Sequence, residues 1–428
     1  MYTENNKFDV IIVGGGAGGL AAAVCCAKKA NKSKGLRIAV LEKEPKPCKK
    51  LLATGNGKCN LTNMNMSEKY YNTSAQSFIK PLLSKYTPQK LIKFWESRGL
   101  FCVPDEYGRV YPNSGQAVSV ADTLLINLKK YNTELFCNTE VKKITKVKGG
   151  FAVGCTDKEY FCKKLIISAG GFVQPNLGSN GSGYSFAKDL NLSCTPLFPS
   201  LAPVLCKDKL LSVVKGVRCN AVVKCIADGK VIHTEKGELQ FNEKNISGIC
   251  IFQLSRHINE FFSLGSVLGR PCRKIQINAD LLPDIAYEEI FSALTLRRRL
   301  YPDSDAAEIF CGLLNKKLSR YLCLKLNINE KLSAGDLSDD DLSAFASLSK
   351  ECTFIPCAPS LKENAQVTAG GVSLAEINKN MECKKYKGLY IIGETLDIDG
   401  LCGGYNLHWA FISGIIAGHN AAAGDSLK

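Results

Sequence analysis

A run of glycines near the start of the chain has the spacing of a phosphate-binding turn. Residues 14–19 read Gly-Gly-Gly-Ala-Gly-Gly, which places a glycine at each fixed position of a G-x-G-x-x-G pattern. The first glycine permits a tight turn, the second lets the backbone approach a pyrophosphate, and the third lets a helix pack on the preceding strand. The free N–H groups at the start of that helix attract anions. The residues expected to contact a dinucleotide here are Gly14, Gly16, Ala17, Gly18 and Gly19.

An acidic residue follows this turn at the spacing of a ribose ligand. Glu42 comes roughly twenty residues after Gly19. A carboxylate in that place accepts hydrogen bonds from an adenosine ribose and repels a 2′-phosphate, so the site favours FAD or NAD over NADP. We expect Glu42, with Lys43 beside it, to contact the adenosine half of the cofactor.

The segments around these residues have the patterns of a strand, a helix and a second strand. Residues 8–13 (FDVIIV) and 37–41 (RIAVL) are short apolar runs rich in β-branched residues, which is typical of parallel strands buried on both faces. Residues 20–30 predict a helix between them. A glycine pattern between a strand and a helix, in this order, indicates a dinucleotide site.

The other end of the chain carries a second set of candidate cofactor ligands. Residues 388–392 (GLYII) predict a strand, which a glycine and an acid follow, and a Gly-Gly pair precedes a helical run to residue 418. The acid suits the hydroxyls of a ribitol chain, and the helix N–H groups suit the pyrimidine oxygens of a flavin. Ligands at both chain ends fit an extended FAD better than NAD alone. These candidate ligands are Gly393, Glu394, Gly403, Gly404, Tyr405 and Asn406.

Residues 49–63 predict an ordered loop that brings its backbone close to the same cofactor. The segment has two glycines among small polar residues and few strand or helix formers. Gly55, Asn56 and Gly57 are expected cofactor contacts, and Lys58 and Asn60 are candidate catalytic residues. A lysine here could stabilise negative charge on a reduced flavin, and an asparagine could orient a substrate carbonyl. The alternative is that these side chains only hold the loop to its own backbone.

Several stretches together resemble the BaiN/YhiN-type flavoproteins, also described as aminoacetone-oxidase-family FAD-binding enzymes or NAD(P)/FAD-dependent oxidoreductases. The stretches are LLATGNGKCNLTN, SAGGFVQPNLGSNGSGY, QVTAGG and GLYIIGETLDIDGLCGGYNLHWAFISG. Together with the first glycine turn, these stretches are distributed along the sequence, so the resemblance covers essentially the whole chain. The resemblance is specific for family and cofactor, and much less so for substrate.

The resemblance implies further cofactor contacts. It places Val141, at the start of a strand, where the main chain pairs with adenine, with an ordinary strand start as the alternative reading. It also places Ala169 and Gly170 in a small-residue element that closes over the cofactor. Lys58 stands where many relatives carry arginine, and Glu394 where aspartate is common. The loss of the guanidinium fork weakens an anion-clamping role for Lys58.

The middle of the chain departs from the nucleotide-site pattern. Residues 196–276 alternate apolar and polar positions between turn signals, with Asp228-Gly229 as a hairpin turn, and residues 280–350 have helical spacing. We therefore predict an α/β fold in which a Rossmann-like FAD-binding domain (residues 1–190 and 357–428) carries an inserted β-rich, barrel-like domain (191–278) and a small helical subdomain (279–356). Substrate is expected beside residues 54–60 or 402–408, where the insertion would cover the flavin.

The amino-acid composition limits which partners the protein can have and in which cellular compartment it is expected. The chain has 428 residues, 20 cysteines without a C-x-x-C pair, and four histidines, so we expect no metal site and a reduced, cytoplasmic protein. The first apolar stretch is broken by glycines and no other stretch is long enough to cross a membrane, so no membrane partner is expected. The charge of +15 comes mostly from lysine, in dispersed pairs such as Lys28-Lys29, Lys49-Lys50 and Lys384-Lys385, which favours a solvated surface over a nucleic-acid face. Nothing in the sequence specifies an oligomeric state.

These observations predict an FAD-dependent oxidoreductase that transfers a hydride between flavin and a small organic substrate. A reductase of unsaturated, steroid- or bile-acid-like compounds, with NADH or NADPH as electron donor, is one subtype that the resemblance implies. No second G-x-G-x-x-G domain for a nicotinamide cofactor is present. The alternatives are a flavin oxidase that uses oxygen and a nucleic-acid-associated flavoprotein.

Three other residues could carry chemistry, and a structural interpretation competes for each. Cys402 precedes a predicted helix, where the helix dipole could lower its pKa, but we favour a packing role. His408, in the same helix, could donate a proton, but helix packing is favoured. Arg109 could bind a carboxylate or a phosphate, or could hold a turn, and the sequence does not separate these two roles.

Overall fold

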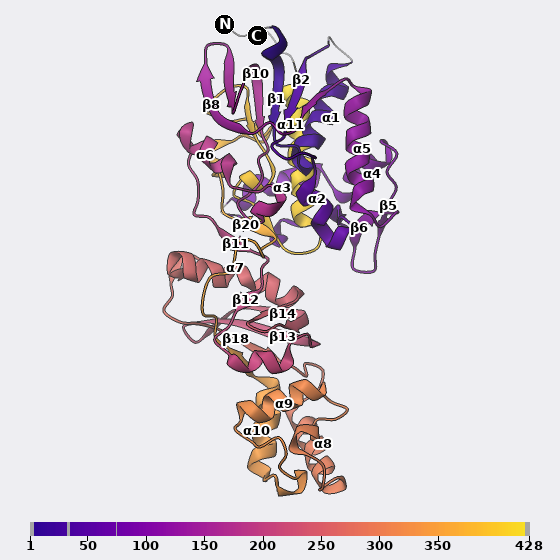
Figure 1. Ribbon diagram of the computed structural model, residues 1–428, viewed down its shortest axis with the longest axis vertical. Helices are drawn as coiled ribbons and strands as arrows, with labels where there is room; N and C mark the ends of the chain where they lie inside the picture. The colour runs from indigo at the N-terminus through magenta and orange to yellow at the C-terminus, as the bar shows by residue number, and fades with distance from the viewer. Residues whose placement is uncertain (1–3, 32–34, 74, 424–428) are drawn as a thin grey trace. The chain divides into compact units, whose positions relative to one another are not determined.

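The computed structural model describes residues 4–31, 35–73 and 75–423 (Figure 1). The chain forms two compact units. The first, called the split unit, contains Met1–Leu197 and Gln366–Lys428, and the second, called the inserted unit, contains Phe198–Ala365. Both ends of the chain therefore belong to one unit.

The main sheet of the split unit is mostly parallel. Its strands are β1 (Lys7–Val13), β2 (Ile38–Leu41), β7 (Glu134–Phe136), β8 (Val141–Val147), β9 (Gly150–Cys155), β10 (Glu159–Ile167) and β21 (Leu389–Ile391). The order is β7-β2-β1-β10-β9-β8. Strands β1, β2, β7 and β10 are parallel, and β21 adds in parallel beside the end of β10. The start of β10 instead pairs antiparallel with β9, which continues into β8.

Helices cover this sheet and connect its strands. They are α1 (Ala17–Ala30), α2 (Lys49–Ala53), α3 (Gln76–Lys85), α4 (Pro88–Glu96), α5 (Ala117–Lys130), α6 (Ser182–Asp189) and α11 (Tyr405–Ala421). Short strands lie between them, namely β3 (Thr62–Asn63), β4 (Tyr71–Asn72), β5 (Cys102–Pro104), β6 (Arg109–Pro112), β20 (Val367–Ala369) and β22 (Asp399–Gly400). The predicted strand–helix–strand order at the N-terminus is present, with α1 starting at Ala17 rather than at residue 20.

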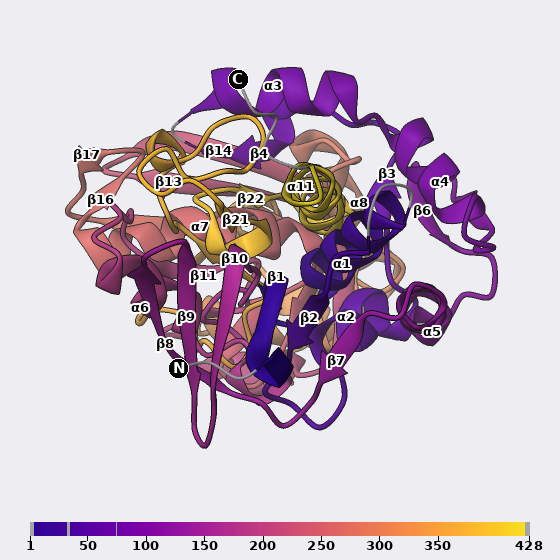
Figure 2. The same cartoon turned by 90° about the horizontal axis from the view of Figure 1, so that it is seen from above.

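Helices α1 and α11 pack backbone against backbone beside the sheet, as Figure 2 shows. A Cβ atom on Gly414 would overlap the carbonyl oxygen of Gly18, and one on Gly418 would overlap that of Ala22. The sheet below is apolar on both faces, since Ile11, Ile12 and many of their neighbours are fully buried. Burying each such side chain contributes about 1.5–3 kcal/mol. The close contact fixes where the first turn of α11 lies relative to the glycine turn that precedes α1.

The inserted unit is built on a sheet with the order β12-β15-β14-β13-β18-β19. These strands are β12 (Val204–Leu205), β13 (Arg218–Ala227), β14 (Lys230–Phe241), β15 (Asn245–Ser247), β18 (Ile275–Asp280) and β19 (Cys352–Phe354), and short strands β11 (Phe198–Ser200), β16 (Ser266–Val267) and β17 (Arg270–Pro271) accompany them. Past β12 and β19 the sheet closes on itself, because Lys207 N donates to Ile355 O (2.9 Å) and Cys357 N to Leu205 O (3.0 Å). The closure is barrel-like. The Asp228-Gly229 turn joins β13 to β14 with positive φ at both residues, as a type I′ hairpin requires.

One long helix interrupts the region that was predicted to be β-rich. Helix α7 (Ile249–Leu264) packs on β14 and β13. Its sequence, ICIFQLSRHINEFFSL, lies within residues 196–276, where alternating apolar and polar positions predicted strands. Its buried positions nevertheless recur with helical spacing, and packing against the sheet overrides the local preference.

The remaining part of the inserted unit is helical. It contains α8 (Tyr287–Leu300), α9 (Lys316–Lys325) and α10 (Asp339–Lys350). Ser338 caps α10 in a capping box with Asp341, where the Ser338 hydroxyl accepts from Asp341 N (3.1 Å) and the Asp341 carboxylate accepts from Ser338 N (2.8 Å). The strand β19 follows directly and returns the chain to the barrel-like sheet.

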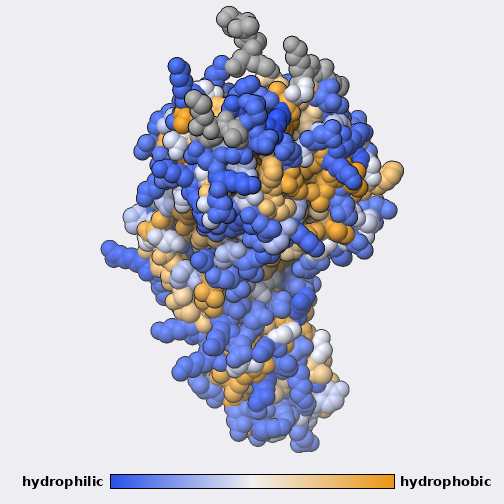
Figure 3. All heavy atoms as spheres, turned by 45° about the horizontal axis from the view of Figure 1, so that its top comes forward, coloured by the Kyte–Doolittle hydropathy of each residue, from blue (hydrophilic) through white to orange (hydrophobic). Residues whose placement is uncertain are grey.

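No helix of the described residues has both the length and the apolar character needed to cross a bilayer. The face in Figure 3 is mostly hydrophilic, with hydrophobic residues gathered in several patches.

Candidate cofactor site

The parallel strands bring the predicted cofactor residues to one edge of the sheet. Val13 lies beside Leu41 and Ile167, and Ile167 lies beside Ile391. The residues that follow these four strand ends are Gly14, Glu42, Ala169 with Gly170, and Gly393 with Glu394. Segments from both ends of the chain therefore meet where ligands bind in open parallel sheets.

The glycine turn is shaped by close backbone contacts that exclude side chains. Gly14 has φ +100°, and a Cβ there would overlap the carbonyl oxygen of Ser168. A Cβ on Gly19 would overlap the carbonyl oxygen of Gly14. A Cβ on Gly16, in contrast, would meet nothing within 4 Å. Gly16 is also the N-cap of α1 and offers no capping side chain, so the first N–H groups of α1 face open space.

Glu42 lies beside this turn. Its carboxylate is 8% exposed and accepts hydrogen bonds from Gly15 N (2.6 Å) and Glu44 N (2.8 Å). These bonds hold the carboxylate at the end of β2, next to the start of α1. Open helix N–H groups beside a fixed carboxylate match the needs of a pyrophosphate and a ribose.

The loop after α2 packs against the start of α11. The first part of the predicted loop is in fact helical, since α2 covers Lys49–Ala53, whereas Thr54–Gly57 form a kinked turn in which Gly55 and Asn56 have left-handed backbone angles. Asn63 Nδ2 donates to Gly403 O (2.9 Å), and a Cβ on Gly404 would lie 2.5 Å from Thr62 O. Gly404 also has φ +100°, so only glycine fits at this junction. The structure thus brings residues 60–63 and Gly403-Gly404 together.

Within this junction Asn60 presents an unsatisfied acceptor. Its Oδ1 atom is buried and has no hydrogen-bond partner in the described structure, and it lies 2.7 Å from the position of a Cβ on Gly404. The helix beside it has no capping side chain. A buried orphan acceptor next to free N–H groups suits a ligand with both N–H and C=O groups, and the pyrimidine end of a flavin has both. The residues present therefore fit FAD at both ends of the site.

The exposed part of the loop holds the other predicted residues. Asn56 has φ +54°, and Gly55, Asn56, Gly57 and Lys58 are all exposed. Backbone bonds within the loop run from Lys58 N to Gly55 O (3.2 Å) and from Cys59 N to Thr54 O (3.0 Å). The loop is therefore held by its own main chain and leaves the Lys58 ammonium at the surface.

Glu394 is engaged by a partner that the sequence interpretation placed on the surface. Lys50 Nζ lies 3.0 Å from Glu394 Oε2, and Thr368 N donates to Glu394 Oε1 (2.9 Å). The two side chains of the ion pair are only 22% and 21% exposed. The expectation that Lys50 belongs to solvated surface was wrong, because a residue far along the chain folds back to pair with it.

Two residues of the C-terminal set hold the protein itself together. Asn406 Oδ1 accepts from Gly400 N (2.7 Å) and its Nδ2 donates to Gly400 O (2.8 Å). The carbonyl oxygen of Tyr405 accepts from Tyr71 OH (2.8 Å). Their side-chain and carbonyl groups thus fix the approach to α11. Of the other predicted contacts, Lys43 is half-buried and Val141, at the start of β8, is buried.

His408 is a packing residue. It is fully buried, with Nε2 3.0 Å from Tyr86 O and Nδ1 2.8 Å from Thr62 Oγ1. A carbonyl oxygen only accepts, so Nε2 carries the proton and Nδ1 accepts from the threonine hydroxyl. Burial lowers the pKa of His408 to about 4, so the ring is neutral at pH 7. The favoured helix-packing interpretation agrees with this geometry.

Arg109 and the cysteines also have structural environments. Arg109 Nε donates to Asp105 Oδ2 (2.7 Å) within the turn that the same carboxylate organises, which favours the turn-holding role. All twenty cysteines are thiols. Burial raises the pKa of the Cys59 thiol to about 12, which makes it a poor thiolate.

Comparisons with known proteins show what the whole chain is similar to. The sequence profile of the HI0933-like protein Rossmann domain matches residues 8–420. The chain is 31% identical over 387 residues to a 3-dehydro-bile acid delta(4,6)-reductase of Clostridium scindens, covering 90% of this chain and 93% of the relative. It is 28% identical over 386 residues to a ribosomal RNA dihydrouridine synthase of Haemophilus influenzae, covering 89% and 91%.

Among solved structures, the fold is similar to a 3-ketosteroid delta1-dehydrogenase of Sterolibacterium denitrificans in complex with 1,4-androstadiene-3,17-dione. The TM-score is 0.51 at 12% identity, over 97% of this chain and 99% of that one. At this identity the likeness concerns the fold. The predicted family and the predicted α/β, Rossmann-like FAD-binding fold are confirmed.

Proposed function

The chain belongs to the HI0933-like Rossmann-domain family and is an FAD-dependent oxidoreductase, and we propose that it reduces a carbon–carbon double bond conjugated with a carbonyl group. The names of two relatives support this. One is a delta(4,6)-reductase of a 3-dehydro-bile acid, in which the double bonds are conjugated with a 3-oxo group. The other makes dihydrouridine, which is uridine whose double bond next to the C4 carbonyl has been saturated. The two substrates differ in size but share this unsaturated unit.

The observation that supports this proposal is the contact between the loop of residues 54–63 and the start of α11. FAD, when bound, would supply the exchange of a hydride. Hydride addition to the far carbon of such a double bond moves negative charge onto the carbonyl oxygen, and a proton from solvent then adds to the remaining carbon of the former double bond. We assign the ammonium of Lys58, which is exposed, and the Nδ2 donor of Asn60 to that oxygen, since Asn60 Oδ1 can only accept a hydrogen bond. Gly14, Gly16 and Glu42 are assigned to the ADP half of the cofactor.

We assign the steroid-like class as substrate, because the relative with 31% identity is named for it. The test is an anaerobic assay of the purified protein with reconstituted FAD. NADH and NADPH are added separately, and bleaching of the flavin band identifies the electron donor. A 3-oxo-4,6-diene steroid is then added, and the loss of its dienone absorbance is followed with the return of the flavin band.

The oxidase alternative predicts a different outcome of the same experiment. If the dienone does not reoxidise the reduced flavin, and the oxidised flavin band returns only when air is admitted, oxygen is the electron acceptor. A third outcome is that neither NADH nor NADPH bleaches the flavin, but dithionite does, and the dienone then restores the oxidised flavin band. This outcome supports the reductase proposal and rejects NADH and NADPH as electron donors.

A second candidate function is reduction of uridine in RNA. The 28% identity over 89% of the chain to a ribosomal RNA dihydrouridine synthase favours it. Its test is incubation of reduced protein with ribosomal RNA lacking dihydrouridine, followed by nucleoside mass spectrometry. A gain of two hydrogens on uridine supports it, and an unchanged nucleoside profile with active steroid turnover rejects it.

A further inference from the structure

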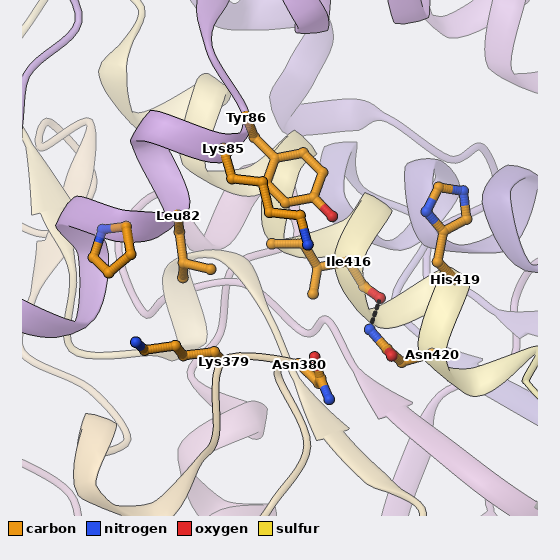
Figure 4. A pocket seen from close by; sticks show the side chains of 9 residues that line it. Leu82, Lys85, Tyr86, Lys379, Asn380, Ile416, His419 and Asn420 are labelled. Atoms are coloured by element: carbon orange, nitrogen blue, oxygen red, sulfur yellow. Dashed lines mark hydrogen bonds between the residues drawn. The ribbon is translucent and has the colours of Figure 1, made fainter. Parts of the chain in front are cut away.

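A pocket of the split unit lies at the opposite end of α11 from the candidate cofactor site. Its volume is about 330 Å³. Helix α11 has 17 residues, and at about 1.5 Å per residue its two ends are about 25 Å apart. The last turn of α11 contributes His419 and Asn420, while Lys85 and Tyr86 come from the end of α3 and Lys379 from a turn across the pocket (Figure 4). The pocket is therefore separate from the residues assigned to FAD.

The lining of this pocket is cationic and contains no acid. Lys85 and Lys379 supply two ammonium groups, and no aspartate or glutamate lines the pocket. Within the described part of the chain, neither lysine lies within ion-pair distance of a carboxylate. Burial, and then the charges of Lys29 and other nearby basic residues, lower the pKa of His419. This positive potential, without an internal counter-ion, favours an anionic ligand.

The segments on both sides of the pocket extend the basic surface. Residues 80–98 include the exposed lysines Lys85, Lys90 and Lys93 and only one acid, Glu96, while Lys80 is paired with Glu68 (3.2 Å). Residues 379–387 include Lys379, Lys384, Lys385 and Lys387 but only one acid, Glu382. A small free anion needs only the pocket, whereas a chain of phosphates would also use the flanks.

The polar and aromatic side chains of the lining suit a nucleotide. Lys85 Nζ lies 5.6 Å from the centre of the Tyr86 ring, so a cation and an aromatic ring are presented together. Asn420 Nδ2 donates to Ile416 O (2.8 Å), which leaves its Oδ1 as an acceptor, and Asn380 adds a second carboxamide. Single-stranded RNA is held by this combination of phosphate-binding lysines, stacking rings and amide groups that face base edges.

The same surface does not suit an anionic membrane. Peripheral membrane sites combine basic residues with exposed apolar side chains that enter the lipid. In residues 80–98 and 379–387, which the structure describes completely, no large hydrophobic side chain is strongly exposed.

We propose that this pocket binds a phosphate group and an adjoining base of single-stranded RNA, with Lys85 and Lys379 on the phosphate. The site anchors the nucleic acid at a distance from the flavin, and its existence does not depend on which unsaturated substrate the flavin reduces.

The test measures binding of a fluorescein-labelled oligouridylate to the full-length, FAD-loaded protein over a range of salt concentrations. The variant is Lys85→Ala/Lys379→Ala. The matched control is Lys207→Ala/Lys362→Ala, which removes the same charge from two exposed lysines of the inserted unit. Loss of two phosphate contacts decreases the slope of log K against log salt by about 1.4 for a single strand, and the control keeps the wild-type slope.

Four outcomes decide the proposal. A smaller slope in the pocket variant alone, with restoration in Lys85→Arg/Lys379→Arg, supports it. Equal slopes in pocket and control variants overturn it, since the effect is then one of net charge. Binding of inorganic phosphate or NADPH in a Lys85- and Lys379-dependent manner without any RNA binding assigns the pocket to a small anion and overturns it. Binding of phosphatidylserine vesicles without RNA binding overturns it in favour of a membrane.

The same samples separate this proposal from the proposed function. Flavin content and reduction by NADH or NADPH are read from the visible spectrum before RNA is added. A protein that reduces the dienone but binds no RNA refutes only the RNA site. A protein that binds RNA through the pocket but reduces no conjugated substrate refutes only the reductase.

Discussion

The two ends of helix α11 are built in opposite ways. At its first turn, Gly404 packs so closely against Thr62 that a Cβ atom on Gly404 would overlap the main chain of Thr62. The buried Oδ1 atom of Asn60, which has no hydrogen-bond partner in the described structure, lies beside this turn. At its last turn, long flexible side chains, Lys85 and Lys379 among them, line an open pocket. One end is specified by the shape of the backbone, and the other by charge. Substitutions should therefore act through sterics and folding at the first end and through salt-dependent binding at the second.

The largest effect is expected at the glycine turn that α11 packs beside. Gly19→Ala would force a methyl group against the carbonyl oxygen of Gly14, so we expect the unfolding free energy of the FAD-free protein to fall by about 3 kcal/mol. Gly16→Ala meets open space, so the FAD-free protein should keep its stability and lose only FAD affinity. Urea unfolding and FAD titration measure both. Wild-type FAD affinity in Gly16→Ala would refute the placement of the pyrophosphate.

A comparable effect is expected from His408, but only over a defined pH range. The folded-state pKa of about 4 lies below the ordinary value of 6.5. The neutral buried ring therefore stabilises the fold above pH 6.5, and this contribution is lost as the pH falls through 6.5 toward 4. The loss can reach about 3 kcal/mol, at about 1.4 kcal/mol per pKa unit. Urea unfolding at pH 7 and pH 4.5 should show a smaller pH dependence in His408→Gln, and an unchanged pH dependence would contradict the assignment.

A smaller effect is expected from the Lys50–Glu394 ion pair. Both side chains are largely buried, so Lys50→Ala should decrease the unfolding free energy by about 1–2 kcal/mol. Lys49→Ala is the matched control, because Lys49 is 45% exposed in its pair with Glu44 and should cost less than about 0.5 kcal/mol. Equal decreases in the unfolding free energy of the two variants would show that burial does not make the Lys50–Glu394 ion pair more stabilising than the Lys49–Glu44 pair.

The smallest effect on stability is expected at the open pocket. Lys85→Ala/Lys379→Ala should change the unfolding free energy by less than about 0.5 kcal/mol and leave FAD content unchanged, because neither lysine has an ion-pair partner among the residues that the structure describes. Thermal unfolding with visible absorbance checks this. A clear loss of FAD in the double variant would mean that the two ends of α11 are coupled.

Features that depend on neighbouring residues could be predicted from the sequence. The glycine turn, the strands around it and the Asp228-Gly229 hairpin each follow from a few adjacent side chains. The resemblance added the pairing of both chain ends in one FAD-binding domain.

Features that depend on long-range packing could not be predicted. Lys50 was read as surface because its partner Glu394 is distant in sequence. Helix α7 was missed because the alternating positions of residues 196–276 predicted strands, and only packing on β14 makes it a helix. The roles of Gly414 and Gly418 become visible only when α1 lies against them. Asn60 was chosen for its polarity, whereas its buried, unsatisfied oxygen is a property of the folded junction.

The most direct test of the central claim is a single anaerobic experiment. The FAD-loaded protein is reduced, a 3-oxo-4,6-diene steroid is added without oxygen, and flavin and dienone absorbance are recorded together. We predict that the oxidised flavin band returns as the dienone band disappears in equal amount, and that Lys58→Ala slows this return while leaving FAD bound. A flavin that stays reduced in the presence of the dienone, and regains its band only when air is admitted, would contradict the account.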